Sequence, residues 1–337
     1  MALITMKFGG TSVGSPEAIT SVVEIVGGEL QRGNQVIVVV SAMSGVTDAL
    51  ISSVREAATG NRWAYQSAAQ RLRDRHEEAL SLLVAAGQPR EAIRHEVSAI
   101  LQQHIDLCEA VNVLGEATPR ISDAVVSFGE RLSSRVVAGA LRAQHIEAAA
   151  LDSTQLIITD ANFGSASVLW DETNAAIADR VQPLLDKGIV PVITGFLGGT
   201  KDGHVTTLGR GGSDYSAAIF AAATDSDELV IWTDVDGVMT TDPRIDKRAR
   251  VLPCVSYTEV GELAFYGAKV LHPKTVQPIL HKGIGLRVRN TFNPAHPGTV
   301  IRKENEPAET VIKAVTSIRS VSLLTVGGKG MIGVPGI

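Results

Sequence analysis

Cysteine is scarce in this sequence. Its two cysteines, Cys108 and Cys254, lie far apart and show neither zinc-site spacing nor the pattern of a disulfide framework. Both are therefore expected to be reduced thiols. Positive charge is also in deficit, since the formal net charge at pH 7 is −5. A phosphate backbone requires a basic protein face, so this balance argues against a general nucleic-acid-binding protein.

Long hydrophobic runs and a signal peptide are missing as well. No apolar run approaches the roughly 20 residues that a membrane-spanning helix needs. The chain begins with Ala2–Phe8, which has the pattern of a strand and lacks the charged and apolar regions of a signal peptide. We therefore expect a cytoplasmic protein without a membrane partner.

Two common nucleotide-binding motifs can be set aside. The P-loop pattern G-x-x-x-x-G-K-[ST] does not occur. One G-x-G-x-x-G occurs, at Gly328–Gly333, but it comes too late for the helix and second strand that a dinucleotide site requires.

Strand and helix patterns alternate along most of the chain. Its 337 residues, 45% of them hydrophobic, suffice for a substantial core. The expected strands are Leu3–Phe8, Gln35–Val40, Ala124–Ser127, Ile189–Thr194 and Glu228–Thr233. The expected helices are 16–32, Leu132–Ala143, Glu172–Asp186 and Tyr215–Ala223, the first capped by Ser15 with Pro16 in its first turn. This alternation predicts an α/β fold with a largely parallel sheet covered on both faces.

Two segments depart from this alternation. Arg62–Val113 is rich in helix-forming residues and broken at Gly87–Pro89, which predicts a helical hairpin inserted in the sheet domain. Near the end, 303–307 resembles a linker, and Thr310–Ser317 and Ser320–Val326 have the pattern of two further strands. A lone strand pair buries little surface, so we expect the start of a further, truncated domain there.

Three motifs follow expected strands, where ligands bind in open α/β sheets. Lys7–Ser12 combines a lysine with paired glycines, which suits an anion, although a tight turn with a solvated lysine is the alternative. Ser41–Thr47 offers small hydroxyl groups for a carboxylate or phosphate. Glu130, in Ser127–Arg131, is suited to pair with a substrate ammonium group or, alternatively, only to favour a helix dipole.

The strongest local signal is Thr206–Asp214. Three glycines surround Arg210 and lead into a helix whose first turn carries Ser213 and Asp214. Loop N–H groups and the helix dipole favour an anion, and arginine can bind a carboxylate or phosphate bidentately. Asp214 is placed to accept hydrogen bonds from a cation or from Lys7. A purely structural role would leave the arginine among glycines unexplained.

Two later motifs suit a nucleotide. A buried strand runs into closely spaced aspartates at Ile231–Val238, and 240–244 forms a Pro-Arg turn, although Asp-Gly and Asp-Pro turns alone would explain both. Gly267–Pro273 supplies another lysine beside glycine, with His272 interpreted as structural.

Taken in order, these motifs resemble one family over roughly residues 1–300. Lys7–Ser12, Ser127–Glu130, Leu208–Asp214, Trp232–Gly237, Thr241–Arg244 and Gly267–Pro273 occur in the order found in aspartate kinases, of the amino acid kinase superfamily. The resemblance implies a three-layer αβα sandwich with a mainly parallel central sheet and two lobes. Residues 1–195 would form an aspartate-binding, catalytic lobe and 196–303 a nucleotide-binding lobe. Residues 304–337 would be a linker and the start of an ACT regulatory domain.

The resemblance also implies roles for single residues. Lys7 would neutralise the transferring phosphoryl group, with Gly9 and Gly10 cradling it, and Asp214 would position the reacting groups. The implied aspartate-binding residues are Ser41, Thr47, Ser213, Glu130 for the ammonium group and Arg210 for a carboxylate. The implied ATP contacts are Thr233, Asp234, Arg244, Lys269 and Met239, the last where many relatives have tyrosine.

The implied reaction is transfer of the γ-phosphoryl group of ATP, with Mg²⁺, to the side-chain carboxylate of L-aspartate. That reaction opens the route to lysine, threonine and methionine. Glutamate 5-kinase and acetylglutamate kinase activities are the enzymatic alternatives, and a non-catalytic amino-acid sensor is the alternative of another class. A homodimer is expected from the resemblance. The regulatory effector and any fused enzyme lie beyond what this sequence indicates.

Overall fold

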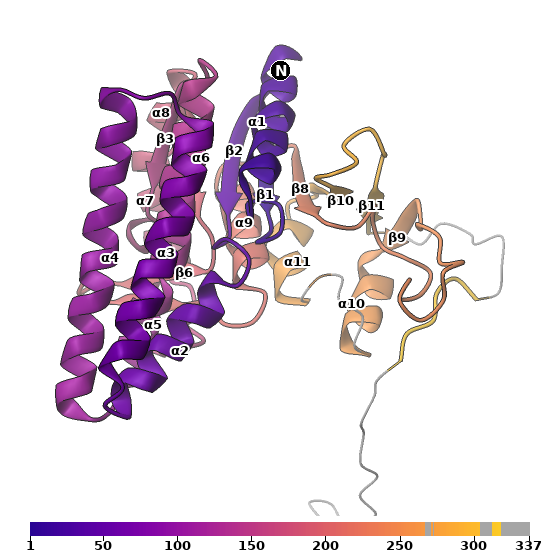
Figure 1. Ribbon diagram of the computed structural model, residues 1–337. Coiled ribbons are helices and arrows are strands. Elements are labelled where there is room, and N and C mark those ends of the chain that lie inside the picture. The colour runs from indigo at the N-terminus through magenta and orange to yellow at the C-terminus, as the bar shows by residue number, and fades with distance from the viewer. Residues whose placement is uncertain (267–270, 272, 304–311, 318–337) are drawn as a thin grey trace, which may run out of the picture.

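The structure is a computed structural model that describes residues 1–266, 271, 273–303 and 312–317. Its centre is an eight-stranded sheet in the order β3-β5-β2-β1-β8-β10-β11-β9 (Figure 1). All neighbouring strands are parallel except β10 and β11. Its strands are β1 (Leu3–Phe8), β2 (Gln35–Val40), β3 (Ala148–Leu151), β5 (Val190–Thr194), β8 (Glu228–Thr233), β9 (Cys254–Ser256), β10 (Gly285–Asn290) and β11 (Thr299–Arg302). The mainly parallel sheet is thus confirmed.

Helices cover both faces of this sheet, and a small second sheet lies at one end. The helices are α1 (Pro16–Gln31), α2 (Val46–Ala58), α3 (Arg62–Leu83), α4 (Gln88–Leu114), α5 (Pro119–Val126), α6 (Phe128–Ala143), η1 (Ser153–Gln155), α7 (Trp170–Arg180), α8 (Gln182–Asp186), α9 (Gly212–Ala223), α10 (Tyr257–Phe265) and α11 (Pro273–Leu280). The small sheet has the order β4-β6-β7 and consists of β4 (Ile158–Thr159), β6 (Leu197–Thr200) and β7 (Val205–Thr207). No helix in the described ranges combines the length and apolar character needed to cross a membrane.

Strand β2 shows why the sheet needs cover on both faces. Successive side chains of a strand point to opposite faces. Val36, Val38 and Val40 belong to one hydrophobic cluster, whereas Ile37 and Val39 belong to another. The unbroken apolar run is therefore shared between two cores, which produces three layers.

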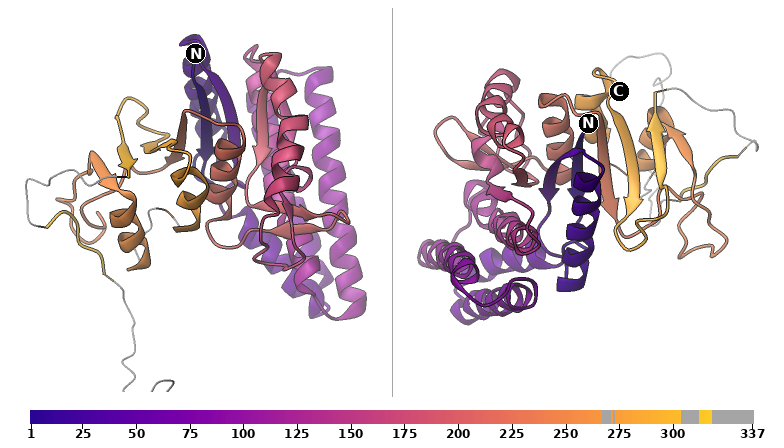
Figure 2. Two further views of the ribbon diagram at one scale, coloured as in Figure 1. Left: turned by 180° about the vertical axis from the view of Figure 1, so that it is seen from behind. Right: turned by 90° about the horizontal axis from the view of Figure 1, so that it is seen from above.

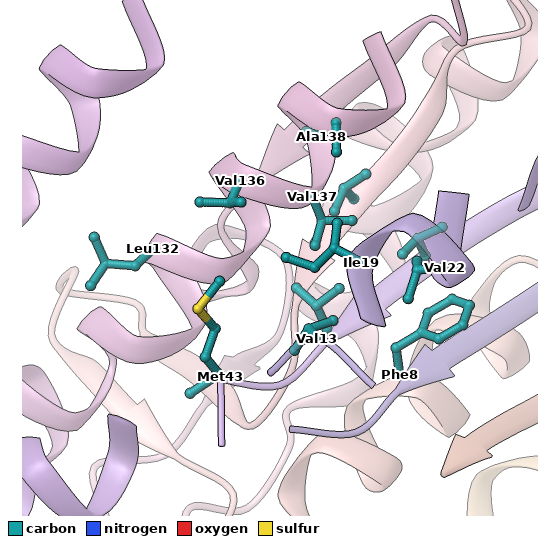
Figure 3. Close-up of a cluster of buried hydrophobic side chains, with 14 of the residues drawn as sticks. Phe8, Val13, Ile19, Val22, Met43, Leu132, Val136, Val137 and Ala138 are labelled. Atoms are coloured by element: carbon teal, nitrogen blue, oxygen red, sulfur yellow. The ribbon is translucent and has the colours of Figure 1, made fainter. Parts of the chain in front are cut away.

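Each core is completed by its own helices. On one face, α1 and α6 contribute Ile19, Val22, Leu132 and Val136, which belong to the same buried cluster as Phe8 of β1 (Figure 3). Helices α7, α9 and α11 fill the other core, with Ile177, Phe220 and Ile279 all fully buried. The sheet edge that carries the carboxyl ends of β1, β2 and β5 is thereby held rigidly between two packed layers.

The inserted helical hairpin is confirmed. Helices α3 and α4 lie side by side outside α6 (Figures 1 and 2), and Leu72, Leu80, Val97 and Leu101 bury their side chains in the core of that face. Pro89 stands in the first turn of α4, where its missing N–H costs no hydrogen bond. The hairpin is thus part of the main core.

One expected strand is wrong. Ala124–Ser127 lies at the end of α5, a helix that begins at Pro119 and is capped by Thr118, whose hydroxyl accepts from the N–H of Ile121 (3.3 Å). Short apolar runs do not distinguish a strand from a buried helix, and here the capping residue and proline decide for helix.

The remaining expectations about helices, strands and cysteines were only partly confirmed. The cap on α1 is confirmed, because the Ser15 hydroxyl accepts from the N–H of Ala18 (3.2 Å). The stretch 172–186 divides into α7 and α8, with Pro183 in the first turn of α8. In the expected strand 310–317, residues 312–317 form no strand, and 310, 311 and the whole of 320–326 lie outside the described residues. Cys108 and Cys254 are both buried, and neither forms a disulfide bond among the described residues.

Candidate active site

A cavity of about 580 Å³ opens where the carboxyl ends of β1, β2 and β5 meet the start of α9. Its walls come from the ends of strands and the starts of helices around it: the end of β1 and the loop after it, the loop after β2 with the start of α2, and the first turn of α6. The loop between β4 and α7, the loop after β5, and the loop before α9 with the first turn of α9 complete them. The lining residues are Lys7, Gly10, Ser41, Ala42, Thr47, Glu130, Gly164, Phe196, Gly209, Arg210, Gly211, Gly212, Ser213 and Asp214. Every residue expected to bind the acceptor or carry the chemistry is among them.

Lys7 and Asp214 form the charged centre of this cavity. Lys7 Nζ lies 2.5 Å from Asp214 Oδ1, and the two side chains are 12% and 18% exposed. Lys7 belongs to β1, which is paired with both β2 and β8, so its backbone has little freedom. Asp214 lies in the first turn of α9, where a carboxylate is favoured by the helix dipole. The pair fixes a cation at the cavity wall.

The two glycines after β1, Gly9 and Gly10, differ in their contacts. A Cβ atom on Gly10 would lie 3.0 Å from the carbonyl oxygen of Ala42, and the carbonyl oxygen of Gly10 accepts from the N–H of Ser44 (3.0 Å). The loops after β1 and β2 therefore touch backbone to backbone, and a side chain at position 10 would require the Ala42 carbonyl to shift by a few tenths of an ångström. Gly9 does not line the cavity, and its N–H donates to the carbonyl oxygen of Trp232 (3.1 Å).

Glu130 is a buried carboxyl group in the wall of the cavity. Its side chain is 3% exposed, and Oε1 accepts from the N–H of Ala42 (3.2 Å). Oε2 is buried and has no hydrogen-bond partner among the described residues. Burial raises the pKa of Glu130 to about 8, against the opposing effects of the Ala42 N–H and of Lys7. A cationic group entering the cavity would supply the missing partner.

Arg210 lines the same cavity as Glu130 and lies in a glycine-rich loop. Gly209 and Gly211, on either side of it, both have positive φ angles (75° and 73°) that favour glycine. Arg210 is exposed and has no ion-pair partner among the described residues. Its guanidinium group is therefore available to an anionic ligand.

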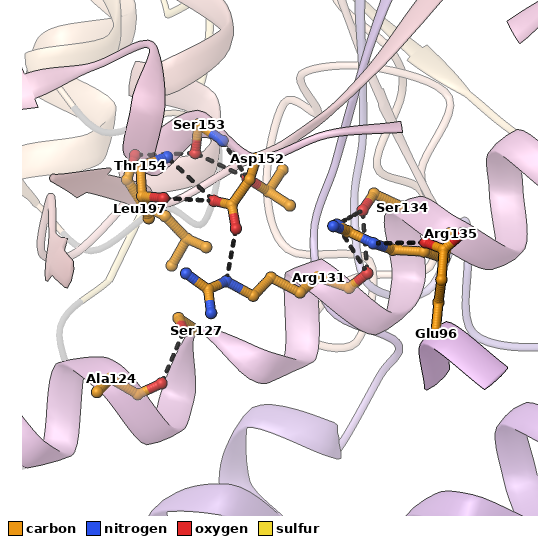
Figure 4. A network of polar contacts seen from close by, with 11 residues as sticks. Glu96, Ala124, Ser127, Arg131, Ser134, Arg135, Asp152, Ser153, Thr154 and Leu197 are labelled. Atoms are coloured by element: carbon orange, nitrogen blue, oxygen red, sulfur yellow. Dashed lines mark hydrogen bonds and ion pairs between the residues drawn. The ribbon is translucent and has the colours of Figure 1, made fainter. Parts of the chain in front are cut away.

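A polar network behind the cavity holds α6 in position (Figure 4). Arg131 Nε pairs with Asp152 Oδ2 at 2.7 Å. Asp152 in turn accepts from the N–H and hydroxyl of Thr154. The hydroxyl of Ser153 contacts that of Thr194 at 2.8 Å, at the end of β5. Arg131 directly follows Glu130, so the network connects the acidic residue to the β5 edge of the site.

Sequence reasoning missed part of the wall. Phe196 lines the cavity with a φ angle of 68°, a strained value for a non-glycine residue. Gly164 lines it too, from the loop between β4 and α7. Phe196 follows β5, so the rule that ligands bind at strand ends would have identified it had the rule been applied to that strand. Gly164 reaches the cavity only through tertiary packing and carries no local signal.

The four described residues among the expected ATP contacts do not line this cavity. Thr233 is the last residue of β8, the neighbour of β1, and Asp234 follows it; the hydroxyl of Thr233 donates to Asp234 Oδ1 (3.2 Å). Arg244 is exposed and binds Asp242 through two hydrogen bonds, of 3.0 and 2.7 Å. Met239 forms a bridge with Val251. Lys269 lies outside the described residues.

The fold and cavity together define an α/β protein with a cavity lined by charged side chains at the carboxyl edge of its sheet. Residues 2–290 match the model of the amino acid kinase family, and the chain belongs to that family. It is 33% identical over 336 residues to aspartokinase 1 of Arabidopsis thaliana chloroplasts, covering 97% of this chain and 57% of that protein. Against the aspartokinase of Rickettsia prowazekii the identity is 36% over 307 residues, covering 90% of this chain and 56% of the relative.

A solved relative matches in structure as well. E. coli aspartokinase III, crystallised with aspartate and ADP, superposes with a TM-score of 0.82 and 32% identity, covering 90% of this chain and 65% of that one. The chain thus spans little more than half the length of the single-function relatives, 57% and 56% of the two named above.

Proposed function

We propose that the protein transfers the γ-phosphoryl group of MgATP to the side-chain carboxylate of L-aspartate, giving 4-phospho-L-aspartate and ADP. The observation that carries the proposal is the cavity itself, in which the Lys7–Asp214 pair, the unpartnered carboxyl of Glu130 and the free guanidinium of Arg210 meet. The similarity to an aspartokinase that binds aspartate and ADP supports it.

The chemistry needs charge neutralisation more than proton transfer. The acceptor carboxylate is ionised at neutral pH, given a reference pKa of about 3.9, so no general base is required. A carboxylate oxygen forms a bond to the γ-phosphorus, the bond from that phosphorus to the bridging oxygen breaks, and ADP leaves with the electron pair. Lys7 stabilises the charge on the phosphoryl oxygens, and its ion pair with Asp214 keeps it oriented.

Recognition of the acceptor follows from the opposite charges in the cavity. Glu130 binds the α-ammonium group, which gives its buried Oε2 a partner. Arg210 binds the α-carboxylate, because a guanidinium group matches a carboxylate bidentately. The hydroxyls of Ser41, Thr47 and Ser213 line the same cavity and donate to the remaining oxygens. An α-amino acid with a second carboxylate satisfies all these groups.

The nucleotide is assigned to residues 196–303, and the acceptor mainly to residues 1–195. Thr233 ends β8 and Asp234 follows it. Because β8 pairs with β1, both residues lie next to the strand that carries Lys7. Among the described residues no three His, Cys, Asp or Glu side chains gather around a possible metal position. Mg²⁺ bound to ATP takes most of its ligands from phosphates and water, and it enters as part of the nucleotide substrate.

A hydroxamate assay tests the proposal, because hydroxylamine traps acyl phosphates. The purified protein is incubated with MgATP and either aspartate, glutamate or N-acetylglutamate. We expect hydroxamate to form with aspartate alone. Equal product with glutamate or N-acetylglutamate would move the assignment to the related kinases, and ATP turnover independent of any acceptor would favour a sensor that has kept the fold.

A further inference from the structure

Asp123, a buried carboxylate outside the cavity, connects two parts of the cavity wall. It lies on α5 and is 4% exposed. Its Oδ2 accepts from the N–H groups of Gly164 (2.8 Å) and Thr207 (2.9 Å), and its Oδ1 accepts from the hydroxyl of Thr207 (2.9 Å). One side chain thus satisfies three donors from segments that are distant in sequence.

Both segments lead directly to cavity-lining residues. Gly164 is itself in the wall, and Thr207 ends β7 just before the loop that carries Gly209 and Arg210. The N–H of Leu208 donates to the carbonyl oxygen of Phe196 (2.9 Å), another residue of the wall. Moving Thr207 would therefore move the loop of Arg210 and its contact with Phe196 together.

The two segments also pack against each other with little tolerance. The N–H of Ala166 donates to the carbonyl oxygen of Thr207 (2.9 Å). A Cβ atom on Gly209 would lie 3.2 Å from both the carbonyl oxygen of Gly164 and the hydroxyl of Ser165. Because the two backbone segments are in such close contact, their separation must be held constant. Asp123 can do this, since it accepts hydrogen bonds from both segments.

We infer that Asp123 is a positioning residue for acceptor binding, because it holds the Gly164 loop and the Arg210 loop at the separation that the substrate carboxylate requires. It touches neither substrate nor the reacting atoms and acts through Arg210. The inference rests on the proposed function for its kinetic consequence. Its structural consequence, a loosened pair of loops, does not depend on that function.

Two substitutions at Asp123 separate the effect of its hydrogen bonds from the effect of its charge. In Asp123→Asn, an amide oxygen at the Oδ2 position can still accept from both N–H groups, and the amide nitrogen can donate to the Thr207 hydroxyl. Asp123→Ala removes every acceptor and leaves buried N–H groups without partners. The neutral asparagine variant should therefore behave like the wild type, whereas the alanine variant should not.

Steady-state kinetics with MgATP and aspartate test this difference. We expect Asp123→Ala to raise the KM for aspartate about tenfold or more, the effect of losing a hydrogen bond to a charged group, with kcat and the KM for ATP within about twofold. Asp123→Asn should raise the aspartate KM by less than about threefold. Unchanged KM in the alanine variant, or equal damage in both variants, would overturn the inference.

A second pair of variants covers the case in which Asp123→Ala does not fold. Thr207→Val keeps the side-chain shape and removes the hydroxyl bonded to Oδ1, whereas Thr207→Ser keeps that hydroxyl. The valine variant should raise the aspartate KM about threefold, less than Asp123→Ala because only one of the three hydrogen bonds to the carboxylate is lost, and the serine variant should not. Identical KM values for the two would contradict the inference.

Amide hydrogen exchange provides a readout that needs no turnover. In Asp123→Ala, or in Thr207→Val if the former does not fold, peptides covering 160–167 and 205–211 should exchange faster than in the wild type. Peptides from β1 and β2 should exchange as before. Unchanged exchange at 160–167 would overturn the inference, whereas a protein with faster exchange but no aspartate-dependent turnover would overturn only the proposed function.

Discussion

Lys7 Nζ lies 2.5 Å from Asp214 Oδ1, across the junction between the first strand of the sheet and the first turn of α9. This pair joins two motifs that are more than half the chain apart in sequence. It keeps the ammonium group extended into the cavity before any nucleotide arrives, and this orientation is what electrostatic stabilisation of a phosphoryl group requires.

We predict that Lys7→Ala lowers kcat about 100-fold or more, the effect of losing one oriented electrostatic donor. The measurement is coupled ADP release at saturating aspartate and MgATP. Lys201→Ala is the matched control, because Lys201 is 61% exposed and pairs with Glu172 outside the cavity. A Lys7→Ala protein with near-normal kcat would remove the basis of the mechanism.

Glu130 should make acceptor binding depend on pH. Burial raises the pKa of Glu130 to about 8, so the carboxyl group is largely protonated below pH 8. The ammonium group of aspartate binds the ionised form, so binding at lower pH must release a proton. We expect the KM for aspartate to fall by up to about tenfold per unit as the pH rises from 6 to 8.

Glu130→Gln is the variant that isolates this effect. It cannot titrate, so its aspartate KM should be higher than that of the wild type at pH 8 and should change little between pH 6 and 8. The KM for ATP serves as the internal control in both proteins. A wild-type aspartate KM that is flat over this range would show that Glu130 does not bind the ammonium group.

Folding stability should decrease in mild acid because of two histidines in the inserted hairpin. Burial lowers the pKa of both His76 and His104 to about 4. Between pH 6.5 and pH 4, these histidines are protonated in the unfolded chain but remain neutral in the folded protein. The free energy of unfolding therefore decreases as the pH falls through about this range. Each histidine should lower the free energy of unfolding by about 3 kcal/mol between pH 7 and pH 4.

Urea denaturation at pH 7, 6 and 5 measures this slope. His104→Leu should make the slope shallower, because only His76 then remains to titrate in the buried hairpin. His95→Leu is the matched control, since His95 lies on α4 but is exposed. A slope that is the same in His104→Leu and the wild type would contradict the assignment.

Local sequence rules accounted for much of the fold and of the site. The apolar run in β2 predicted a strand buried on both faces. The motifs at the ends of β1 and β2 were expected at a ligand site, and Lys7, Gly10 and Ser41 all line the cavity. These predictions succeed because parallel strands bring their carboxyl ends to one edge whatever the intervening chain does. The helix containing Ala124–Ser127 was missed because three apolar residues in a row carry no periodicity.

Residues that act at a distance could not be found in this way. Asp123 looks like a surface aspartate in the sequence, and only the fold brings Gly164 and Thr207 to its oxygens. Side-chain to backbone bonds between distant segments leave no spacing signature, because the acceptor is a peptide group that every residue has. Glu130 was singled out because it follows an expected strand, and its burial and raised pKa emerged only from packing.

Arg75 is a further residue of this kind, and it connects the helical hairpin to the cavity. Its Nη1 donates to the carbonyl oxygen of Ser44 (2.6 Å) and its Nη2 to that of Gly14 (2.8 Å). Those oxygens belong to the loops after β2 and β1, which carry acceptor-binding hydroxyls and the Gly10 turn. We predict that Arg75→Ala lowers kcat/KM about tenfold, because charged hydrogen bonds to two loops are lost at once.

Arg71→Ala is the matched control for this prediction. Arg71 lies one turn earlier on α3, is exposed, and bonds only the hydroxyl of Ser67 among the contacts described for it. Arg75→Lys should recover little activity, since a single ammonium group cannot reproduce the fork that spans both carbonyl oxygens. If Arg75→Ala and Arg71→Ala showed the same kcat/KM, the hairpin would be a passive part of the core, without influence on the loops that bind the substrates.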